Sequence, residues 1–277
     1  MNTKNKKTFA IIGRPIEHSL SPTLHNYWLK KYKINADYSL LHIDESEIET
    51  VIKRIRNNEI SGINVTLPYK QKVIPYIDEL VNDAKLANSV NTIFLDNKNV
   101  LIGENTDVYG LQAGYLKELT EAKNKRVLIM GAGGVAPSVI LSLQKSQINN
   151  ISIVNRTHEK SIFIKKRFNF INVLKWENLE KQIKNFDIII NATSLGLKNN
   201  NDFDFDFKEV RDNLIFIDTI YNPLETKTLR YLKEKKIKTF NGLEMFIYQG
   251  QKAFYLWNKI NPEIDDDLIN LLVSKLQ

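Results

Sequence analysis

The amino-acid sequence predicts a two-domain α/β protein, in which an N-terminal α/β domain is followed by a Rossmann-type, doubly wound domain. Three observations favour this fold. The chain has 277 residues, a comfortable length for two domains, and 43% of them are hydrophobic, enough for two cores. Short β-rich runs alternate with helical patterns along the chain, as in sheets covered by helices. In the second half, a glycine-rich turn joins a continuous apolar run to a helical pattern.

The first domain is placed at residues 1–107, where four strands and two helices are predicted. The strands span residues 8–12, 38–43, 62–65 and 89–95, and the helices span residues 21–31 and 46–57. Ser21 is predicted as the N-cap of the first helix, because Pro22 then occupies the first helical position. The second helix carries apolar side chains on one face, namely Ile48, Val51, Ile52 and Ile55. This alternation predicts a mostly parallel sheet.

The second domain is placed at residues 108–242 and has the rhythm of a doubly wound fold. A helix is expected from Val108 to about Leu119, and apolar strands at residues 126–130, 151–154, 187–191 and 214–218. The asparagine-rich segment Lys198–Asp202 and the alternating Phe/Asp run after it are interpreted as a surface loop. Residues 243–277 should form two helices, 243–257 and 264–276, that pack back on the first domain.

A glycine-rich segment follows the apolar strand 126–130 directly and precedes a helical pattern. It reads Gly131-Ala132-Gly133-Gly134-Val135-Ala136 and fits the pattern G-x-G-x-x-G/A. In such a segment Gly131 allows a tight turn, and Gly133 lets the backbone approach a pyrophosphate. The small Ala136 permits close packing of helix on strand, while the helix N-terminus supplies N–H donors. The strand–turn–helix context therefore predicts a dinucleotide site.

The end of the next strand indicates which dinucleotide is bound. NAD sites usually carry an acidic residue there, which accepts a hydrogen bond from the ribose 2′-hydroxyl. This chain instead has Asn155-Arg156-Thr157, a guanidinium suited to a phosphate between two hydrogen-bonding side chains. NADP is therefore predicted over NAD.

Several other classes of protein are disfavoured by the composition. The chain has no cysteine, and its four histidines have no metal-binding spacing, so no metal is expected. The net charge of +7 is spread among asparagines and indicates solvated faces, not a nucleic-acid site. The apolar run near the N-terminus ends by Gly13, too soon for a signal peptide, and no run approaches the roughly 20 residues that span a bilayer. We expect a cytoplasmic protein without a membrane or nucleic-acid partner.

Polar residues of the first domain are concentrated at strand ends and loops. The segments are Ser19–Ser21, Asn64–Lys70, Asn91–Thr92 and Asn105–Asp107. Together they offer hydroxyls, amides, one ammonium and one carboxylate. This set suits a small polyhydroxylated acid, which needs several directed hydrogen bonds.

These segments and those of the second domain resemble, in the same order, the motifs of the shikimate dehydrogenase family. The resemblance covers about residues 9–257 and rests on eight segments: 13–22 with His25-Asn26, 64–70, 90–92, 105–107, 155–157, 191–196, 218–223 and 242–249. Departures occur at Ala87-Asn88-Ser89, at Glu244 and at Gln251-Lys252. The resemblance implies NADPH-dependent, reversible reduction of 3-dehydroshikimate to shikimate on the route to chorismate and the aromatic amino acids, in a cleft between the two domains.

The resemblance also implies a role for each matching residue. Ser19 and Ser21 would bind the substrate carboxylate. The ring and its hydroxyls would be surrounded by Asn64, Thr66, Asn91, Tyr221 and Gln249. Lys70 and Asp107 would form the catalytic pair and contact the substrate. The nicotinamide end of the cofactor would lie along Thr193, Thr219, Gly242 and Met245. We expect a monomer or a homodimer.

The chemistry of these residue types agrees with the implied reaction. Reduction of a ketone needs a hydride and a proton for the developing alkoxide, and an ammonium such as Lys70 can stabilise that charge and donate the proton. A carboxylate such as Asp107 can hold the lysine charged and in place. A simpler interpretation makes Asp107 only an N-cap of the helix that follows it. His18 and His25 are interpreted as structural residues.

Two alternative functions stay open at this point. A quinate/shikimate dehydrogenase with broader cofactor use would share most of the motifs, although Ser19, Ser21 and the segment Asn155–Thr157 argue against it. A non-catalytic NADP-binding sensor would keep the dinucleotide site without turnover. Both Lys70 and Asp107 are present, which disfavours a sensor.

Overall fold

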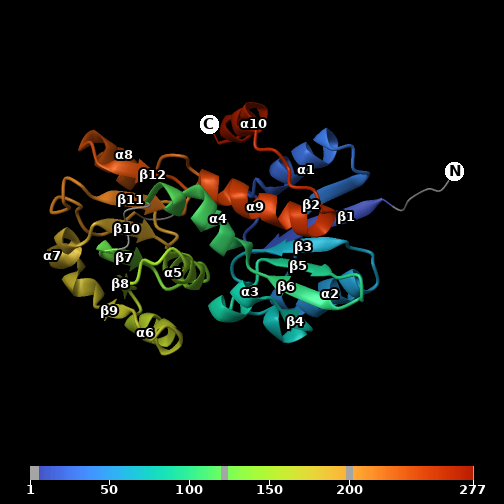
Figure 1. Cartoon of the computed structure of the whole chain (residues 1–277), viewed down its shortest axis with the longest axis horizontal. Coiled ribbons are helices and arrows are strands. Elements are labelled where there is room, and N and C mark those ends of the chain that lie inside the picture. Colours follow the sequence, from blue (N-terminus) through green and yellow to red (C-terminus); the bar gives the residue numbers. More distant parts are fainter. Residues whose placement is uncertain (1–5, 120–123, 198–201, 277) are drawn as a thin grey trace. The chain divides into compact units, whose positions relative to one another are not determined.

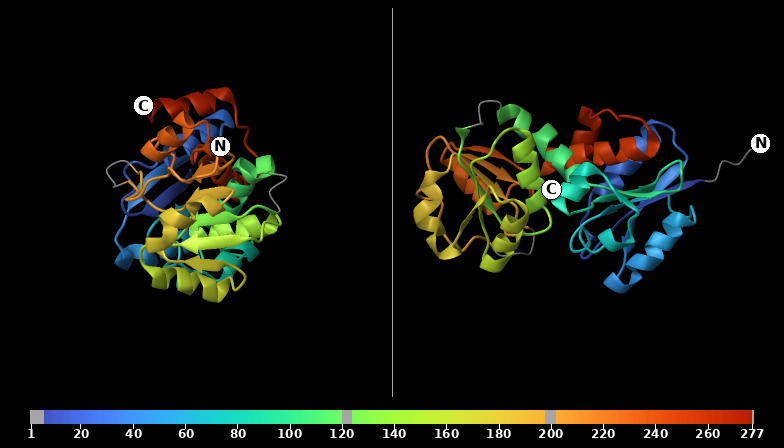
Figure 2. Two further views of the ribbon diagram at one scale, coloured as in Figure 1. Left: turned by 90° about the vertical axis from the view of Figure 1, so that its left-hand side faces the viewer. Right: turned by 60° about the horizontal axis from the view of Figure 1, so that its bottom comes forward.

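The computed structural model describes residues 6–119, 124–197 and 202–276, which fold as two compact units. The first unit comprises Met1–Tyr109 with Gln249–Lys275, and the second comprises Gly110–Tyr248 with Leu276–Gln277. Two helices contain residues of both units, α4 (Thr106–Gly114) and α9 (Leu243–Asn258). Figures 1 and 2 show one sheet with covering helices in each unit.

The first unit is built on a six-stranded sheet with the order β2-β1-β3-β5-β6-β4. The strands are β1 (Lys7–Gly13), β2 (Ala36–His42), β3 (Gly62–Val65), β4 (Glu79–Leu80), β5 (Thr92–Leu95) and β6 (Leu101–Glu104). β1 pairs in parallel with β2 and β3, as the sequence predicts, but β5 runs antiparallel to both β3 and β6. The hairpin between β5 and β6 escaped prediction because it turns without glycine: Asp96 accepts the N–H groups of Lys98 and Val100, and Asn99 adopts a left-handed φ of 60°.

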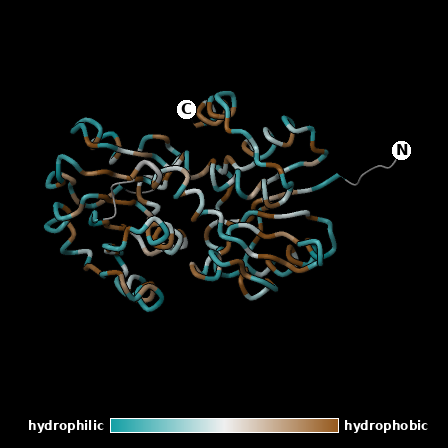
Figure 3. Tube along the Cα trace, in the orientation of Figure 1, coloured by the Kyte–Doolittle hydropathy of each residue, from teal (hydrophilic) through white to brown (hydrophobic). Residues whose placement is uncertain are grey.

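Helices cover both faces of this sheet. They are α1 (Ser21–Lys31), α2 (Ile48–Arg56), α3 (Asn82–Ala87), α10 (Asp266–Ser274) and the later turns of α9, with short 3-10 segments at Glu45–Glu47 and Ile74–Tyr76. On one face the apolar side of α2 packs against Ala10, Ile12 and Ile63. On the other, Trp257 of α9 stacks on Phe9 of β1. Figure 3 shows stretches of hydrophobic colour in the strands and a mixture of hydrophilic and hydrophobic colours along the helices.

The start of α1 differs from the prediction in one detail. Ser21 is the first residue of the helix, and Leu20 is the N-cap, without a side-chain cap bond. The prediction of Ser21 as the cap is therefore wrong. Its hydroxyl instead accepts a hydrogen bond from Ser19 Oγ, 3.1 Å away, and its N–H donates to the same Ser19 oxygen.

The residues after this start explain the His25-Asn26 pair. Asn26 exchanges two hydrogen bonds with the backbone of Tyr38 and so fixes α1 to β2. His25 is 1% exposed, and its ring stacks on that of Tyr38 with centroids 4.4 Å apart. Burial lowers the pKa of His25 to about 3. A neutral histidine among aromatic rings fits the structural interpretation, not a catalytic base.

The C-terminal helix α10 is attached to α1 by a small ionic cluster. Asp265, the N-cap of α10, accepts hydrogen bonds from Tyr27 (2.8 Å) and from Lys31, which also binds Glu263 at 2.7 Å. Burial alone would raise the pKa of Asp265, but the bonds from Lys31, the Leu268 N–H and Tyr27 outweigh it and lower the pKa to about 2.

We expect this cluster to make stability depend on pH in acid. Because the folded pKa of Asp265 is depressed, its contribution is present above the ordinary carboxyl pKa of about 4 and is lost as the pH falls through about 2. Asp265→Asn should lower the melting temperature at pH 7 by roughly 1–3 °C, as expected for a partly exposed ion pair, and keep the cap. Thermal melts of both proteins, with Asp266→Asn as control, measure this. A difference that persisted at pH 2 would contradict it.

The second unit is built on a six-stranded sheet with the order β12-β11-β10-β7-β8-β9. The strands are β7 (Val127–Met130), β8 (Ile151–Val154), β9 (Asn172–Leu174), β10 (Ile188–Asn191), β11 (Ile215–Asp218) and β12 (Lys238–Phe240), all parallel. Counted from β7, this is the strand order of the Rossmann fold, so the predicted fold class is confirmed. The order reverses between β7 and β10, where such sheets bind nucleotides.

Helices also cover both faces of the second sheet. They are α5 (Ala136–Lys145), α6 (His158–Arg167), α7 (Leu179–Gln182), α8 (Lys227–Glu234) and 3-10 segments at Leu116–Leu119, Trp176–Asn178 and Ile183–Asn185. α5 and α6 pack on one core, α7 and α8 on the other. The helix predicted from Val108 to Leu119 is in fact α4 followed by the 3-10 segment Leu116–Leu119.

The aromatic run after residue 202 corrects another prediction. Residues 198–201 of the predicted surface loop lie outside the described residues. Phe203, Phe205 and Phe207 follow in irregular backbone, but their rings contact one another, and Phe207, 4% exposed, packs edge-on against Phe216 of β11. The segment is therefore a loop, as predicted, but its aromatic rings pack on the core of the second unit.

In the described residues, no helix has the length and apolar character needed to cross a membrane.

Candidate functional site

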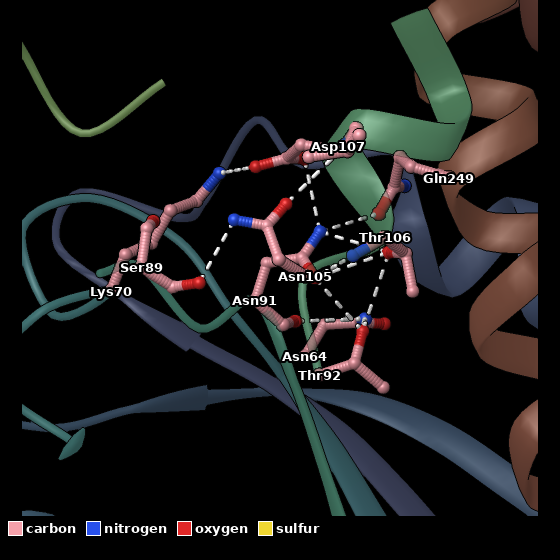
Figure 4. A network of polar contacts seen from close by, with 10 residues as sticks. Asn64, Lys70, Ser89, Asn91, Thr92, Asn105, Thr106, Asp107 and Gln249 are labelled. Carbon is pink, nitrogen blue, oxygen red and sulfur yellow. Dashed lines mark hydrogen bonds and ion pairs between the residues drawn. The ribbon is translucent and has the colours of Figure 1, made fainter. Parts of the chain in front are cut away.

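A buried ion pair lies at one end of a polar network in the first unit (Figure 4). Lys70 Nζ donates to Asp107 Oδ2 over 2.6 Å, and the two residues are only 9% and 4% exposed. Asp107 is the single hydrogen-bond partner of the ammonium within the described part of the chain. Two of the three N–H groups of Lys70 are therefore available to a ligand.

Asn91 holds the carboxylate of this pair in place. Its Nδ2 donates to Asp107 Oδ1 and to Thr106 Oγ1, both at 2.9 Å, and more weakly to Gln249 Oε1 at 3.4 Å. Its Oδ1 accepts the N–H of Thr106 at 2.7 Å. Both the NH₂ group and the oxygen of Asn91 are therefore hydrogen-bonded inside the network, which fixes the orientation of Asp107.

Asn64 lies on β3, and its side-chain amide is also occupied by hydrogen bonds within the network. Its Oδ1 accepts from Tyr38 OH at 2.8 Å, and its Nδ2 donates to Asn91 O and Thr92 Oγ1, both at 3.1 Å. Asn64 can therefore meet a ligand hydroxyl only through the second lone pair of its oxygen. Tyr38 escaped prediction as part of the site, because nothing in the sequence shows that β2 places its hydroxyl beside Asn64.

The backbone before α4 explains how Asp107 reaches the network. Asn105 Nδ2 donates to Ser89 O at 2.8 Å, and Asn105 Oδ1 accepts the N–H of Val108 at 3.3 Å. Asn105 therefore satisfies the first turn of α4, whereas Asp107 lies inside the helix and directs its carboxylate to Lys70. The simpler interpretation of Asp107 as an N-cap is wrong.

The departure at Ala87-Asn88-Ser89 leaves this support intact. Asn88 ends α3 in the left-handed conformation with φ 51°, a conformation that asparagine tolerates, and the carbonyl of Ser89 still receives Asn105. At the other departures, Gln251 donates to Pro262 O at 2.7 Å, and Glu244 is exposed. The ammonium of Lys252 lies 5.8 Å from the ring of Tyr109.

The remaining predicted substrate residues fall into two groups. Ser19 and Ser21 contact each other, as described above, and Thr66 is half-buried after β3. Gln249 joins the network through Asn91. Tyr221 belongs to the second unit, where its ring stacks on Phe246 with centroids 4.5 Å apart.

In the second unit, the glycine-rich segment follows β7 as predicted. Gly131 has a φ of +106°, and a Cβ there would lie 2.7 Å from Ala192 O, so only glycine fits. At Gly133 a Cβ would meet nothing within 4 Å, which leaves its backbone open to a ligand. α5 then begins at Ala136, so the N-terminus of a ten-residue helix follows directly.

The segment after β8 is bonded to this glycine-rich turn. Asn155 Oδ1 accepts the N–H of Ala132 at 3.1 Å, and its Nδ2 donates to Thr157 O at 2.9 Å. Arg156 and Thr157 are exposed beside it. A guanidinium without a neighbouring carboxylate in this segment fits a 2′-phosphate better than a free ribose hydroxyl.

The residues predicted for the nicotinamide end lie after β10, after β11 and at the start of α9. Thr193 and Thr219 follow β10 and β11, and the N–H of Gly242 donates to Ile220 O at 2.7 Å. Met245 is 7% exposed, and its N–H donates to Tyr115 OH. Among the described residues, no cluster of histidine and acidic side chains could hold a metal ion.

Comparison with known protein families gives two matches, one within each unit of the chain. Residues 11–93 match the shikimate dehydrogenase substrate binding domain, and residues 115–227 match shikimate / quinate 5-dehydrogenase. A shikimate dehydrogenase (NADP+) from Pelagibacter ubique is 49% identical over 269 residues, which cover 96% of this chain and 99% of that protein.

Solved structures agree over nearly the whole chain. A shikimate dehydrogenase in complex with NADP+ is 35% identical, with a TM-score of 0.91 over 100% of this chain and 98% of the other. Shikimate dehydrogenase from Thermus thermophilus, in complex with NADP(H) and shikimate, is 26% identical, with a TM-score of 0.85 over 98% and 100% of the two chains.

Proposed function

This chain belongs to the shikimate dehydrogenase family, and we propose that its Lys70 and Asp107 are the catalytic pair of the reversible, NADPH-dependent reduction of 3-dehydroshikimate to shikimate. It is an NADP-dependent oxidoreductase that acts on a CH–OH group, with a role in aromatic amino acid biosynthesis. The observation that supports the catalytic assignment most directly is the buried Lys70–Asp107 ion pair, oriented by Asn91.

The residues of the second unit fit NADP. The open backbone at Gly133 and the N-terminus of α5 suit a pyrophosphate, with the neighbouring Gly131, Ala132, Gly134 and Val135 forming the rest of the turn. The segment Asn155–Thr157 suits the 2′-phosphate. Thr193, Thr219, Gly242 and Met245 are assigned to the nicotinamide end. When bound, the cofactor supplies a hydride to the carbonyl carbon.

The chain's own residues supply the proton. Lys70 directs its free N–H groups to the carbonyl oxygen, stabilises the developing alkoxide and donates one proton to it. In the reverse direction the neutral amine takes the proton from the substrate hydroxyl. Asp107 holds the ammonium through the 2.6 Å bond and can accept from a neighbouring substrate hydroxyl. Lys70 recovers its proton from solvent after each reduction.

Further residues orient the substrate in this proposal. Ser19 and Ser21 present two adjacent hydroxyls to its carboxylate. The ring hydroxyls are assigned to Asn64, Thr66, Asn91, Tyr221 and Gln249. Residues 1–107 form the substrate domain, residues 108–242 the NADP domain, and residues 243–277 the C-terminal helices. We expect the protein to act in the cytoplasm as a monomer or homodimer, and sedimentation equilibrium distinguishes these two states.

Arg156 provides a test of the cofactor assignment. Arg156→Ala should raise the KM for NADPH by about tenfold to a hundredfold, because one charge-assisted bond to the 2′-phosphate is lost, and leave the KM for NADH nearly unchanged. Steady-state kinetics with both cofactors measure this. Lys181→Ala, which removes an exposed charge from α7, is the matched control. Equal losses with both cofactors would contradict the assignment of Arg156 to the 2′-phosphate.

The alternative of a quinate/shikimate dehydrogenase differs in substrate and cofactor range. Paired assays with shikimate or quinate and with NADP+ or NAD+ discriminate it. Preference for shikimate and NADP+ is expected, because Ser19 and Ser21 are present and the β8 end lacks an acidic residue. A non-catalytic sensor would bind NADP+ without turnover of either substrate.

A further inference from the structure

Two buried polar residues of the second unit have no role in the reaction described so far. Asn191 ends β10 and Asp218 ends β11, where they are partners in the parallel register, and both are 0% exposed. They lie at the carboxyl ends of these strands, and β10 pairs with β7, which leads into the glycine-rich turn. This is the point where the strand order reverses and where such sheets bind nucleotides.

Asn191 determines the path of the chain after β10. Its Oδ1 accepts both the N–H (3.0 Å) and the hydroxyl (2.7 Å) of Thr193, and its Nδ2 donates to Leu195 O at 3.1 Å. Its backbone carbonyl accepts the N–H (3.1 Å) and the hydroxyl (2.8 Å) of Thr219. One asparagine therefore fixes both threonines that are assigned to the nicotinamide end.

Asp218 determines the path of the chain after β11. Its Oδ1 accepts from Asn191 Nδ2 and from the N–H of Ile220, both at 3.0 Å, and its Oδ2 accepts from Thr226 Oγ1 at 3.0 Å. The carbonyl of Ile220 in turn receives the N–H of Gly242. The network thus connects the two loops to the start of α9.

This network requires polar side chains at both positions, 191 and 218. Burial raises the pKa of Asp218 to about 7, although its three donors act in the opposite direction. A hydrophobic side chain would avoid this cost of burial, but one N–H of Asn191 Nδ2, the Ile220 N–H and the Thr226 hydroxyl would each lose their acceptor. The network therefore depends on an acceptor at 218 and on a donor at 191.

We propose that Asn191 and Asp218 are positioning residues, which hold the segments at the nicotinamide end of the cofactor site in the arrangement that hydride transfer requires. This inference rests on the proposed function. Neither residue touches the substrate, and each acts through the loops that it binds.

The test compares two probes that differ only in the nicotinamide, NADP+ and 2′-phospho-ADP-ribose, by calorimetry. Asn191→Asp keeps the shape but places an acceptor against Asp218 Oδ1 and Leu195 O. This variant should weaken the binding of NADP+ by about tenfold or more, the usual scale for buried groups left without a partner. Binding of 2′-phospho-ADP-ribose should stay within about twofold of the wild-type value, because the segments assigned to its phosphates, 131–135 and 155–157, are not the loops that Asn191 and Asp218 bind. Asn172→Asp, the same change at an exposed position of β9, is the control.

Kinetics provide the second readout. In Asn191→Asp, kcat should fall while the KM for shikimate stays unchanged, and the isotope effect with deuterated NADPH should rise because hydride transfer becomes slower. Asp218→Asn should retain wild-type behaviour, since its oxygen can still accept from Asn191 and Ile220 while its amide donates to Thr226 Oγ1. Asp218→Ala should behave like Asn191→Asp.

Three results would overturn the proposal. Equal weakening of both probes would show that the two residues support the unit as a whole, and unchanged NADP+ binding would show that the network is dispensable. If Asn191→Asp fails to fold, the comparison of Asp218→Asn with Asp218→Ala replaces it. Equal behaviour of these two variants would contradict the proposal. A wild-type protein that binds NADP+ more tightly than 2′-phospho-ADP-ribose but turns over no substrate would instead contradict the proposed function, and with it the role in hydride transfer, and leave only the ordering of the nicotinamide end for binding.

Discussion

Lys70→Met is expected to lower kcat for the reduction of 3-dehydroshikimate by about 10²–10⁴-fold, the usual contribution of a positioned proton donor. Methionine keeps the length of the side chain, but it removes both the proton and the charge that stabilises the alkoxide. Binding of NADP+ should be unchanged, because the glycine-rich turn belongs to the second unit. Stopped-flow absorbance of NADPH and calorimetry measure the two effects separately.

Two further variants separate proton transfer from charge. Lys70→Arg keeps a cation beside Asp107, but a guanidinium does not give up its proton, so kcat should fall nearly as far while the melting temperature is preserved. Lys72→Met removes an exposed lysine two residues away, which pairs with Glu45, and should leave kcat unchanged. Wild-type activity in Lys70→Arg would show that charge alone suffices and would contradict the assignment of Lys70 as proton donor.

Asp107→Asn is expected to lower kcat by about 10²-fold or more, comparable to the loss of other groups that orient a proton donor. The amide has the shape of the carboxylate and can still accept from Asn91. Its NH₂ group, however, faces the ammonium of Lys70, which is then neither held nor neutralised. Steady-state kinetics of the variant measure the loss, with Asp266→Asn, an exposed position of α10, as the control.

The double variant shows whether the pair acts as a unit. The kcat of Lys70→Met with Asp107→Asn should be no lower than that of Lys70→Met alone, because Asp107 affects proton transfer through the lysine that is already absent. It should also be more stable than Lys70→Met, in which a buried carboxylate lacks its partner. Fully additive losses would instead assign Asp107 a separate contact with the reacting atoms.

The fold could be predicted where the sequence carries a strong periodic signal. Buried parallel strands such as 127–130 and 188–190 are continuous apolar runs, and the turn at Gly131 needs a residue that tolerates positive φ. The hairpin between β5 and β6 could not be predicted in this way. Its turn is made by side-chain bonds of Asp96 to the backbone and by the left-handed Asn99, so no glycine or proline marks it in the sequence.

The site could be predicted in its residues but not in their connections. The motif order points to Lys70, Asn91 and Asp107, and the structure joins them in one network. Tyr38, Asn191 and Asp218 lie on strands, and the sequence of a strand gives no sign of the partner that a polar side chain meets on the next strand. Their roles follow only from the register of neighbouring strands, which local sequence does not specify.

The most direct test of the account is the formation of NADPH from shikimate and NADP+ by the purified protein, measured beside Lys70→Arg, with quinate and NAD+ in parallel reactions. The account predicts rapid formation of NADPH with shikimate, slow reaction with quinate or NAD+, and near-complete loss in the variant. No turnover with any pairing, together with NADP+ binding shown by calorimetry, would contradict it and favour a non-catalytic NADP-binding sensor.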